Sequence, residues 1–119
     1  MTLFDSTQLS LEAAMRGSSL RQTLLTNNLA NVNTPGYQRR DVDFHATLRA
    51  AEASGSVEGI ESVAFQPTVE TGNLMRPDGS GVDPDKESAA LAENGLEYQA
   101  LVQVAGARNA ILQTAMGVR

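Results

Sequence analysis

Apolar side chains near the N-terminus recur at steps of three and four residues, the spacing that places them on one side of an α-helix. The stretch from about residue 6 to residue 30 contains no proline and a single glycine, Gly17. We therefore predict a long first helix there, although Gly17 and the two serines after it are poor helix formers. Its wide apolar face is made of two seams, Leu11, Met15, Leu25, Leu29 and Val32 in one and Leu9, Ala13, Leu20 and Leu24 in the other.

This helix should end within residues 31–37 (NVNTPGY). Proline has the φ that the second position of a β-turn requires, and glycine readily takes the positive φ of the third position. We therefore expect a turn over Thr34, Pro35, Gly36 and Tyr37, with Gly36 in the left-handed region.

A second long helix is predicted from residue 84 to about residue 116. Asp83 can cap it, Pro84 suits its first position, and Asp85 and Glu87 favour the positive end of the helix dipole. A helix of this length spans about 50 Å. It too has two apolar seams, Leu91, Tyr98, Leu101, Ala105, Leu112 and Ala115 in one and Leu96, Ala100, Val104, Ala107 and Ile111 in the other.

The middle of the chain, residues 50–81, is rich in glycine, serine and proline and has only short β-like fragments such as residues 62–65 (SVAF). We interpret it as a loop or small irregular excursion that could include one short β-hairpin. The predicted fold is mainly α, with two long terminal helices in a helical hairpin or coiled-coil-like arrangement. One domain would comprise an N-terminal assembly helix with its turn (1–38), an irregular middle segment (39–81) and a C-terminal assembly helix (82–119).

Charged residues are unevenly distributed along the two predicted helices. Residues 22–38 contain none, and residues 98–118 contain only Arg108. A helix without a charged face is usually buried on most sides, yet two helices in a chain of 119 residues can cover only one face of each other. We therefore expect their remaining faces, rich in Asn, Gln, Thr and Ala, to contact other subunits.

Little in the sequence points to catalysis or to a bound cofactor. His45 is the only histidine, and no serine in a strand-turn-helix context accompanies it. In residues 78–85 (DGSGVDPD), Val82 and Pro84 interrupt the ligand pattern of a calcium loop, and the glycines do not match a phosphate-binding loop. The chain has no cysteine for a disulfide or a thiolate metal site. We therefore predict that the protein is not an enzyme and that it has no catalytic, cofactor-binding or metal site.

The composition also excludes some classes of binding partner. The net charge of −5 argues against nucleic acid, which requires a clustered basic surface. Polar residues interrupt the most apolar stretch, residues 100–118, so we expect neither a membrane span nor direct lipid insertion. The N-terminus lacks the basic and apolar regions of a cleavable signal peptide.

Residues 24–37 (LLTNNLANVNTPGY) resemble the N-terminal signature of flagellar rod, hook and hook-associated proteins, in which an amide-rich helix end meets a Thr-Pro-Gly-Tyr turn. Residues 39–44 (RRDVDF) and 82–103 (VDPDKESAALAENGLEYQALVQ) are similar to the proximal-rod FlgB branch of that group. The short middle disfavours hook and distal-rod proteins, which insert larger domains there. Gly106 departs from a good helix sequence and costs about 1 kcal/mol relative to alanine, so it either permits a close contact or marks a bend.

The resemblance implies a structural subunit of the proximal rod of the bacterial flagellar basal body, located in the periplasm and exported through the flagellar type III apparatus without a cleavable signal peptide. It also implies helical assembly through the terminal helices into a torque-transmitting shaft. The implied partners are other copies of the chain, other flagellar rod proteins, and the membrane-ring, rod-adaptor and export-gate components at the rod base. The expected subunit interface comprises Leu20, Leu24, Asn27, Asn28, Asn31, Thr34, Pro35, Gly36, Tyr37, Leu91, Asn94, Tyr98, Leu101, Gln103 and Leu112.

The alternative from a different functional class is a soluble helical-hairpin adaptor that binds a single protein partner through its amphipathic face. A monomer whose helicity does not depend on concentration would favour the adaptor.

Overall fold

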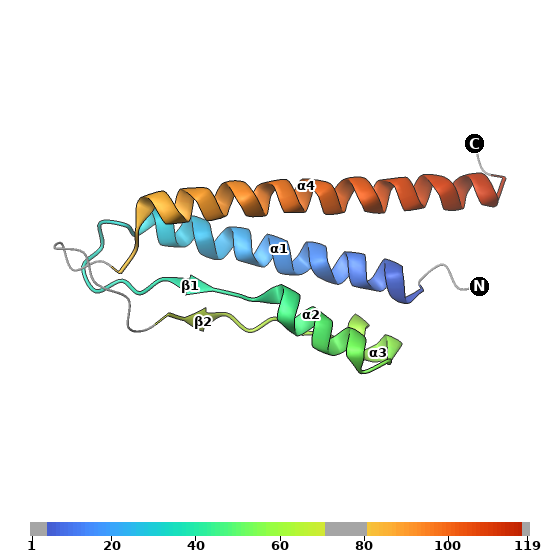
Figure 1. Cartoon of the computed structure of the whole chain (residues 1–119), viewed down its shortest axis with the longest axis horizontal. Coiled ribbons are helices and arrows are strands. Elements are labelled where there is room, and N and C mark those ends of the chain that lie inside the picture. Colours follow the sequence, from blue (N-terminus) through green and yellow to red (C-terminus); the bar gives the residue numbers. More distant parts are fainter. Residues whose placement is uncertain (1–4, 71–80, 118–119) are drawn as a thin grey trace.

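The computed structural model describes residues 5–70 and 81–117 of an elongated, flat molecule that measures 61 × 31 × 14 Å. Its helices are α1 (Ser6–Ala30), α2 (Phe44–Ala53), α3 (Val57–Glu61) and α4 (Pro84–Ala115), and its strands are β1 (Arg40–Asp41) and β2 (Thr68–Val69). In Figure 1, α1 and α4 lie side by side and antiparallel, and α2 and α3 lie on the other side of α1. The central element is therefore α1.

The two terminal helices begin and end close to the predicted positions. The Asp5 carboxylate accepts a hydrogen bond from the Gln8 N–H at 2.9 Å and caps α1. Asp83 does the same for α4, accepting from the Asp85 N–H at 3.0 Å, with Pro84 in the first helical position. The mainly α fold with two long terminal helices is confirmed.

The predicted turn after α1 is also confirmed. The Tyr37 N–H donates to the Thr34 carbonyl oxygen at 3.2 Å, and Gly36 has a φ of +78°. The positive φ explains the glycine at this position, since residues with a side chain rarely adopt it. The turn reverses the chain so that β1 runs back along α1 (Figure 1).

The middle of the chain has more regular structure than the sequence indicated, because α2 and α3 form within it. Asp43 caps α2 by accepting from the Ala46 N–H at 3.1 Å, and the buried side chains of Phe44 and Leu48, one turn apart, face the rest of the fold. The energy that holds α2 in place therefore comes from tertiary packing, which local sequence patterns do not reveal.

A β-hairpin was one possibility for the middle, and the structure has a different strand pairing. β1 and β2 pair antiparallel, with Arg40 opposite Val69 and Asp41 opposite Thr68, so two segments far apart in the sequence meet. The β-like residues 62–65 are not in a strand. Of residues 78–85, which do not match a calcium loop, Asp78, Gly79 and Ser80 lie outside the described residues.

The apolar core lies where α2 and α3 pack against the N-terminal half of α1. A side chain at Gly17 would place its Cβ 2.5 Å from the Cβ of Phe44, a residue that is only 1% exposed. A glycine inside α1 thus lets Phe44 contact the helix backbone, which explains why a poor helix former is found at position 17. The core cluster consists of Leu9, Ala13, Ala14, Phe44, Leu48 and Ile60.

Candidate assembly interface

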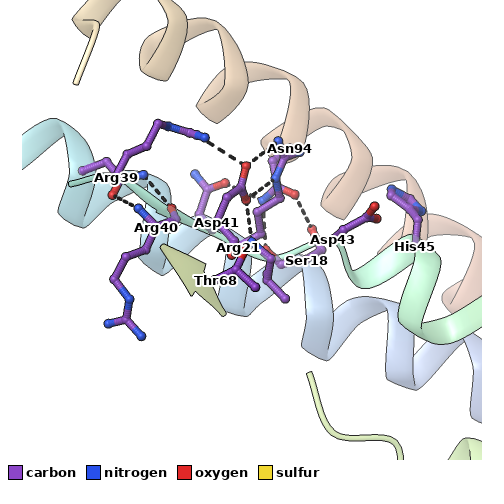
Figure 2. Close-up of polar contacts among 12 residues, drawn as sticks. Ser18, Arg21, Arg39, Arg40, Asp41, Asp43, His45, Thr68 and Asn94 are labelled. Carbon is purple, nitrogen blue, oxygen red and sulfur yellow. Dashed lines mark hydrogen bonds and ion pairs between the residues drawn. The ribbon is translucent and has the colours of Figure 1, made fainter. Parts of the chain in front are cut away.

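The contacts between α1 and α4 include a buried network of polar side chains. The Asn94 Nδ2 donates to the Ser18 carbonyl oxygen at 2.9 Å and to the Gln22 Oε1 at 2.8 Å, and its Oδ1 accepts from the Ser18 hydroxyl at 3.2 Å (Figure 2). Asn94 and Ser18 are fully buried. Sliding α4 along α1 would leave these groups unpaired, so the network fixes the register of the two helices.

Asn28, near the end of α1, bonds the backbone of β1. Its Nδ2 donates to the Arg40 carbonyl oxygen at 2.7 Å, and its Oδ1 accepts from the Arg40 N–H at 3.0 Å and from the Tyr37 hydroxyl at 3.2 Å. The side-chain amide thus takes the place of a neighbouring strand for Arg40. Through this residue, α1 holds both the turn and β1.

Charged side chains complete this region (Figure 2). Arg39 forms ion pairs with Glu87 at the start of α4 and with Asp41, and Arg21 contacts Asp41 at 3.0 Å. The Glu87 side chain is only 2% exposed. Arg39 and the Asn28 Nδ2, at 3.3 Å, therefore replace the water that the buried carboxylate has lost. We call the following residues the polar junction: Arg21, Asn28, Tyr37, Arg39, Asp41, Glu70 and Glu87.

The pKa values within the polar junction follow from its geometry. Burial raises the pKa of Asp41, but hydrogen bonds from Arg21 and the Val42 N–H, together with the charges of Arg21 and Arg39, outweigh burial and hold that pKa below its ordinary value. Burial lowers the pKa of Arg39, and its contacts with Glu87 and the other nearby carboxylates raise it by more, so the net direction is upward. The junction therefore keeps both groups charged at neutral pH.

The second apolar seam of α4 faces away from the rest of the described chain. Leu96 is 69% exposed, Val104 49% and Ile111 68%, and the two alanines between them in the seam are also exposed. We call this seam the outer ridge: Leu96, Ala100, Val104, Ala107 and Ile111. Large apolar side chains gathered on one exposed face mark a contact surface more often than scattered single ones do.

Comparison with known proteins connects these features to a family. Residues 10–38, which span most of α1 and the turn, match the family described as flagella basal body rod protein. Over 114 aligned positions the chain is 36% identical to the flagellar basal body rod protein FlgB of Bacillus subtilis (strain 168), covering 87% of each protein. The chain belongs to the FlgB family of flagellar basal body rod proteins.

Other FlgB proteins show similar agreement. The chain is 36% identical over 105 positions to FlgB of Cereibacter sphaeroides, covering 81% of this chain and 82% of the relative. It is 32% identical over 114 positions to FlgB of Salmonella typhimurium (strain LT2), covering 82% and 83%. Membership of this family assigns the chain a structural role in the flagellar basal body and not an enzymatic one.

The residues first considered for chemistry have structural positions in this rod-family fold. His45 is exposed and pairs with Glu97 at 2.8 Å while its ring stacks on Phe44. Asp83, from the acidic run, caps α4. Among the described residues, no group of acidic, histidine or cysteine side chains could hold a metal ion. Within the same part of the chain, no helix has the length and apolar character that crossing a membrane requires.

The residues expected at the subunit interface fall into three groups. Three are buried within the chain and hold it together: Leu24, Asn28 and Asn94. The half-buried ones are Leu20, Asn31, Tyr37, Leu91, Leu101 and Leu112, and the exposed ones are Asn27, Thr34, Pro35, Gly36, Tyr98 and Gln103. Only the last two groups can offer their side chains to a neighbouring subunit.

Sequence reasoning missed two features of the site. It assigned Glu87 only to the helix dipole and did not pair it with Arg39, because nothing local indicates that residues 48 positions apart meet. It recognised the outer ridge as a seam but left Leu96, Val104 and Ile111 out of the expected interface. The four-and-three spacing of their seam, which runs into residues 98–118 with their single charge, was the signal that could have included them.

Proposed function

We propose that this chain is a proximal-rod subunit that assembles helically, with copies of itself and with other rod proteins, through the outward faces of α1 and α4. The outer ridge is the observation that carries the proposal, because Leu96, Val104 and Ile111 remain exposed on a helix whose residues 98–118 include only one charge. Covering such side chains with a neighbour contributes about 25 cal/mol per Å² of apolar surface.

The polar junction supports a mechanical role. It ties α1, the turn, β1 and the start of α4 together through buried hydrogen bonds and ion pairs, so each subunit has one defined shape. Contacts between two different faces of identical subunits generate open helical arrays when the rotation between neighbours does not close a ring. An array of such subunits would share torsional load among many lateral contacts and transmit torque.

The other proposed contacts lie at the turn end of the molecule. Asn27, Thr34, Pro35 and Gly36 are exposed and uncharged, and such groups can be buried against a neighbour without the desolvation cost of charges. We assign this end to contacts with other rod proteins and with ring, adaptor or export-gate components at the rod base. The proposed location is the periplasm, reached through the flagellar type III export apparatus.

Two glycines with the same backbone geometry provide the test. Gly36 has a φ of +78° and Gly55 a φ of +69°, and a Cβ at either would meet nothing within 4 Å. Valine at either position therefore strains the backbone without a clash. Gly36→Val should spare export and block rod assembly, whereas Gly55→Val, in the loop between α2 and α3, should spare both.

The readouts are immunoblots of exported protein and of isolated basal bodies, together with swimming motility. Normal, motile flagella in Gly36→Val cells at ordinary protein levels would show that the turn is not an assembly junction. Circular dichroism separates the subunit from a single-partner adaptor, because a subunit completed by its neighbours gains helix on assembly. Equal helicity in dilute and assembled protein would favour the adaptor.

A further inference from the structure

A groove runs between α1 and α4 on a side of the helix pair that α2 and α3 leave open. Met15, Ser19, Leu20 and Tyr98 line it, and it continues past Ser19 and Tyr98 to Gly95. These α1 residues are different from those that pack into the core cluster. The first part alone has a volume of about 540 Å³, so it has room for several side chains of a neighbour.

The groove and the outer ridge lie on different sides of α4. Tyr98, in the groove, and Ala100, on the ridge, are two residues apart, which is roughly 200° around an α-helix. At Gly95 no side chain fills the end of the groove, and a Cβ there would meet nothing within 4 Å, so the groove is open at this point. One molecule therefore presents a concave surface on one side and a convex apolar surface on another.

We infer that the groove of one copy seats the outer ridge of a second copy of this chain, an inference that rests on the proposed function. The charges fit this pairing. The outer ridge carries none, and the groove has Glu12 and Arg16, of opposite sign and one helical turn apart on α1. Arg16 is exposed and can stay in water at the rim, and the half-buried Glu12 carboxylate already accepts a hydrogen bond from the Gln8 side-chain amide at 3.4 Å.

The pairing joins two different faces, so it does not close into a symmetric dimer. Each copy that seats a ridge in its groove still offers its own ridge to the next copy. The contact therefore extends into a row of subunits, and each added copy repeats the same groove-to-ridge geometry.

Disulfide crosslinking in basal bodies tests this geometry, since the chain has no cysteine of its own. The double variant carries Ser19→Cys in the groove and Val104→Cys on the ridge, both at exposed positions. The two thiols cannot bond within one chain, because Ser18 contacts Asn94 and Val104 lies ten residues further along α4, about 15 Å away. The matched control pairs Ser19→Cys with Glu58→Cys, exposed on α3.

Oxidised basal bodies with the Ser19→Cys, Val104→Cys protein should give a ladder of dimers, trimers and larger species when probed for this chain. The control double variant and each single variant should give no ladder. Normal incorporation without a ladder, or a crosslink to a protein of another mass, would overturn the groove-to-ridge pairing and leave the proposed function standing. If the unmodified chain is absent from basal bodies, the proposed function fails, and the pairing fails with it.

Discussion

The two halves of α4 differ in what they contact. The first half contains the two buried residues of the helix, Glu87 and Asn94, and both bond to α1. From Tyr98 onward no described residue of α4 is buried, and the Arg108–Asp5 ion pair, at 3.1 Å, is partly exposed. One continuous helix therefore folds the chain with its first half and presents its second half to the surroundings.

The chemistry of the two halves reverses the usual distribution of polar and apolar side chains. Buried polar groups specify position, because displacement leaves a donor or acceptor unpaired. An exposed apolar ridge stabilises contact with a neighbour. Shifting that contact leaves no hydrogen-bond donor or acceptor unpaired, so the ridge specifies position less strongly than a buried polar group does. This division suits a subunit in which the first half of α4 is fixed within the chain and the second half is covered by neighbours.

The largest expected effect is on the free energy of unfolding, and it distinguishes two adjacent arginines that lie beside the first half of α4. Arg39→Ala would remove the arginine that neutralises the buried Glu87 carboxylate and leave it the hydrogen bond from the Asn28 Nδ2, and it should lower the free energy of unfolding by about 3–5 kcal/mol. Arg40 is exposed and bonds Asn28 through its backbone, so Arg40→Ala should change that free energy by less than about 0.5 kcal/mol. Urea denaturation followed by circular dichroism measures both. Equal losses would show that the buried pair does not hold the first half of α4.

Replacing a glycine with alanine should change the free energy of unfolding in opposite directions in the two long helices. Gly17→Ala forces its Cβ to 2.5 Å from Phe44 and should lower the free energy of unfolding by about 1–3 kcal/mol. Gly106→Ala meets nothing within 4 Å and should raise it by up to about 1 kcal/mol through helix propensity. Thermal unfolding of the two variants compares them. Stabilisation by both would mean that Phe44 is not held against α1.

Two leucines of α4 should separate folding from assembly. Leu101 is half-buried against the core cluster, so Leu101→Ala should cost about 1–2 kcal/mol, less than a fully buried leucine. Leu96 is 69% exposed, and Leu96→Ala should change the stability of the isolated chain by less than about 0.5 kcal/mol while reducing its incorporation into basal bodies. Unchanged incorporation of the Leu96 variant would remove the outer ridge from the interface.

The smallest expected effect is the loss of stability in acid that comes from protonation of Asp41. Because the folded-state pKa of Asp41 is lowered, its stabilising contribution is complete above the unfolded-state pKa of about 3.9 and is lost as pH falls through the lower folded-state value. Asp41→Asn should therefore be less stable than the unmodified chain at neutral pH, and the difference should narrow below about pH 4. Denaturant titrations across this range would show it, and a constant difference would mean that the Arg21–Asp41 pair adds nothing.

The candidate site was only partly predictable from sequence. The spacing of apolar positions indicated both seams of α4, and the absence of charge indicated surfaces that need partners. Asn28 and Asn94 were assigned to a neighbour because the sequence does not distinguish an amide that bonds within the chain from one that bonds outside it. Their partners, Arg40 and Ser18, come close only after the chain has folded.

Local sequence alone determined the ends of both long helices and the turn between α1 and β1. Asp5, Asp83, Pro84 and Gly36 act on backbone groups a few residues away, so their effects do not depend on the rest of the fold. Tertiary structure decided the formation of α2, the need for glycine at position 17 and the pairing of Arg39 with Glu87. Each of these depends on contacts between segments distant in the chain, and such contacts become favourable only when packing brings both partners out of water together.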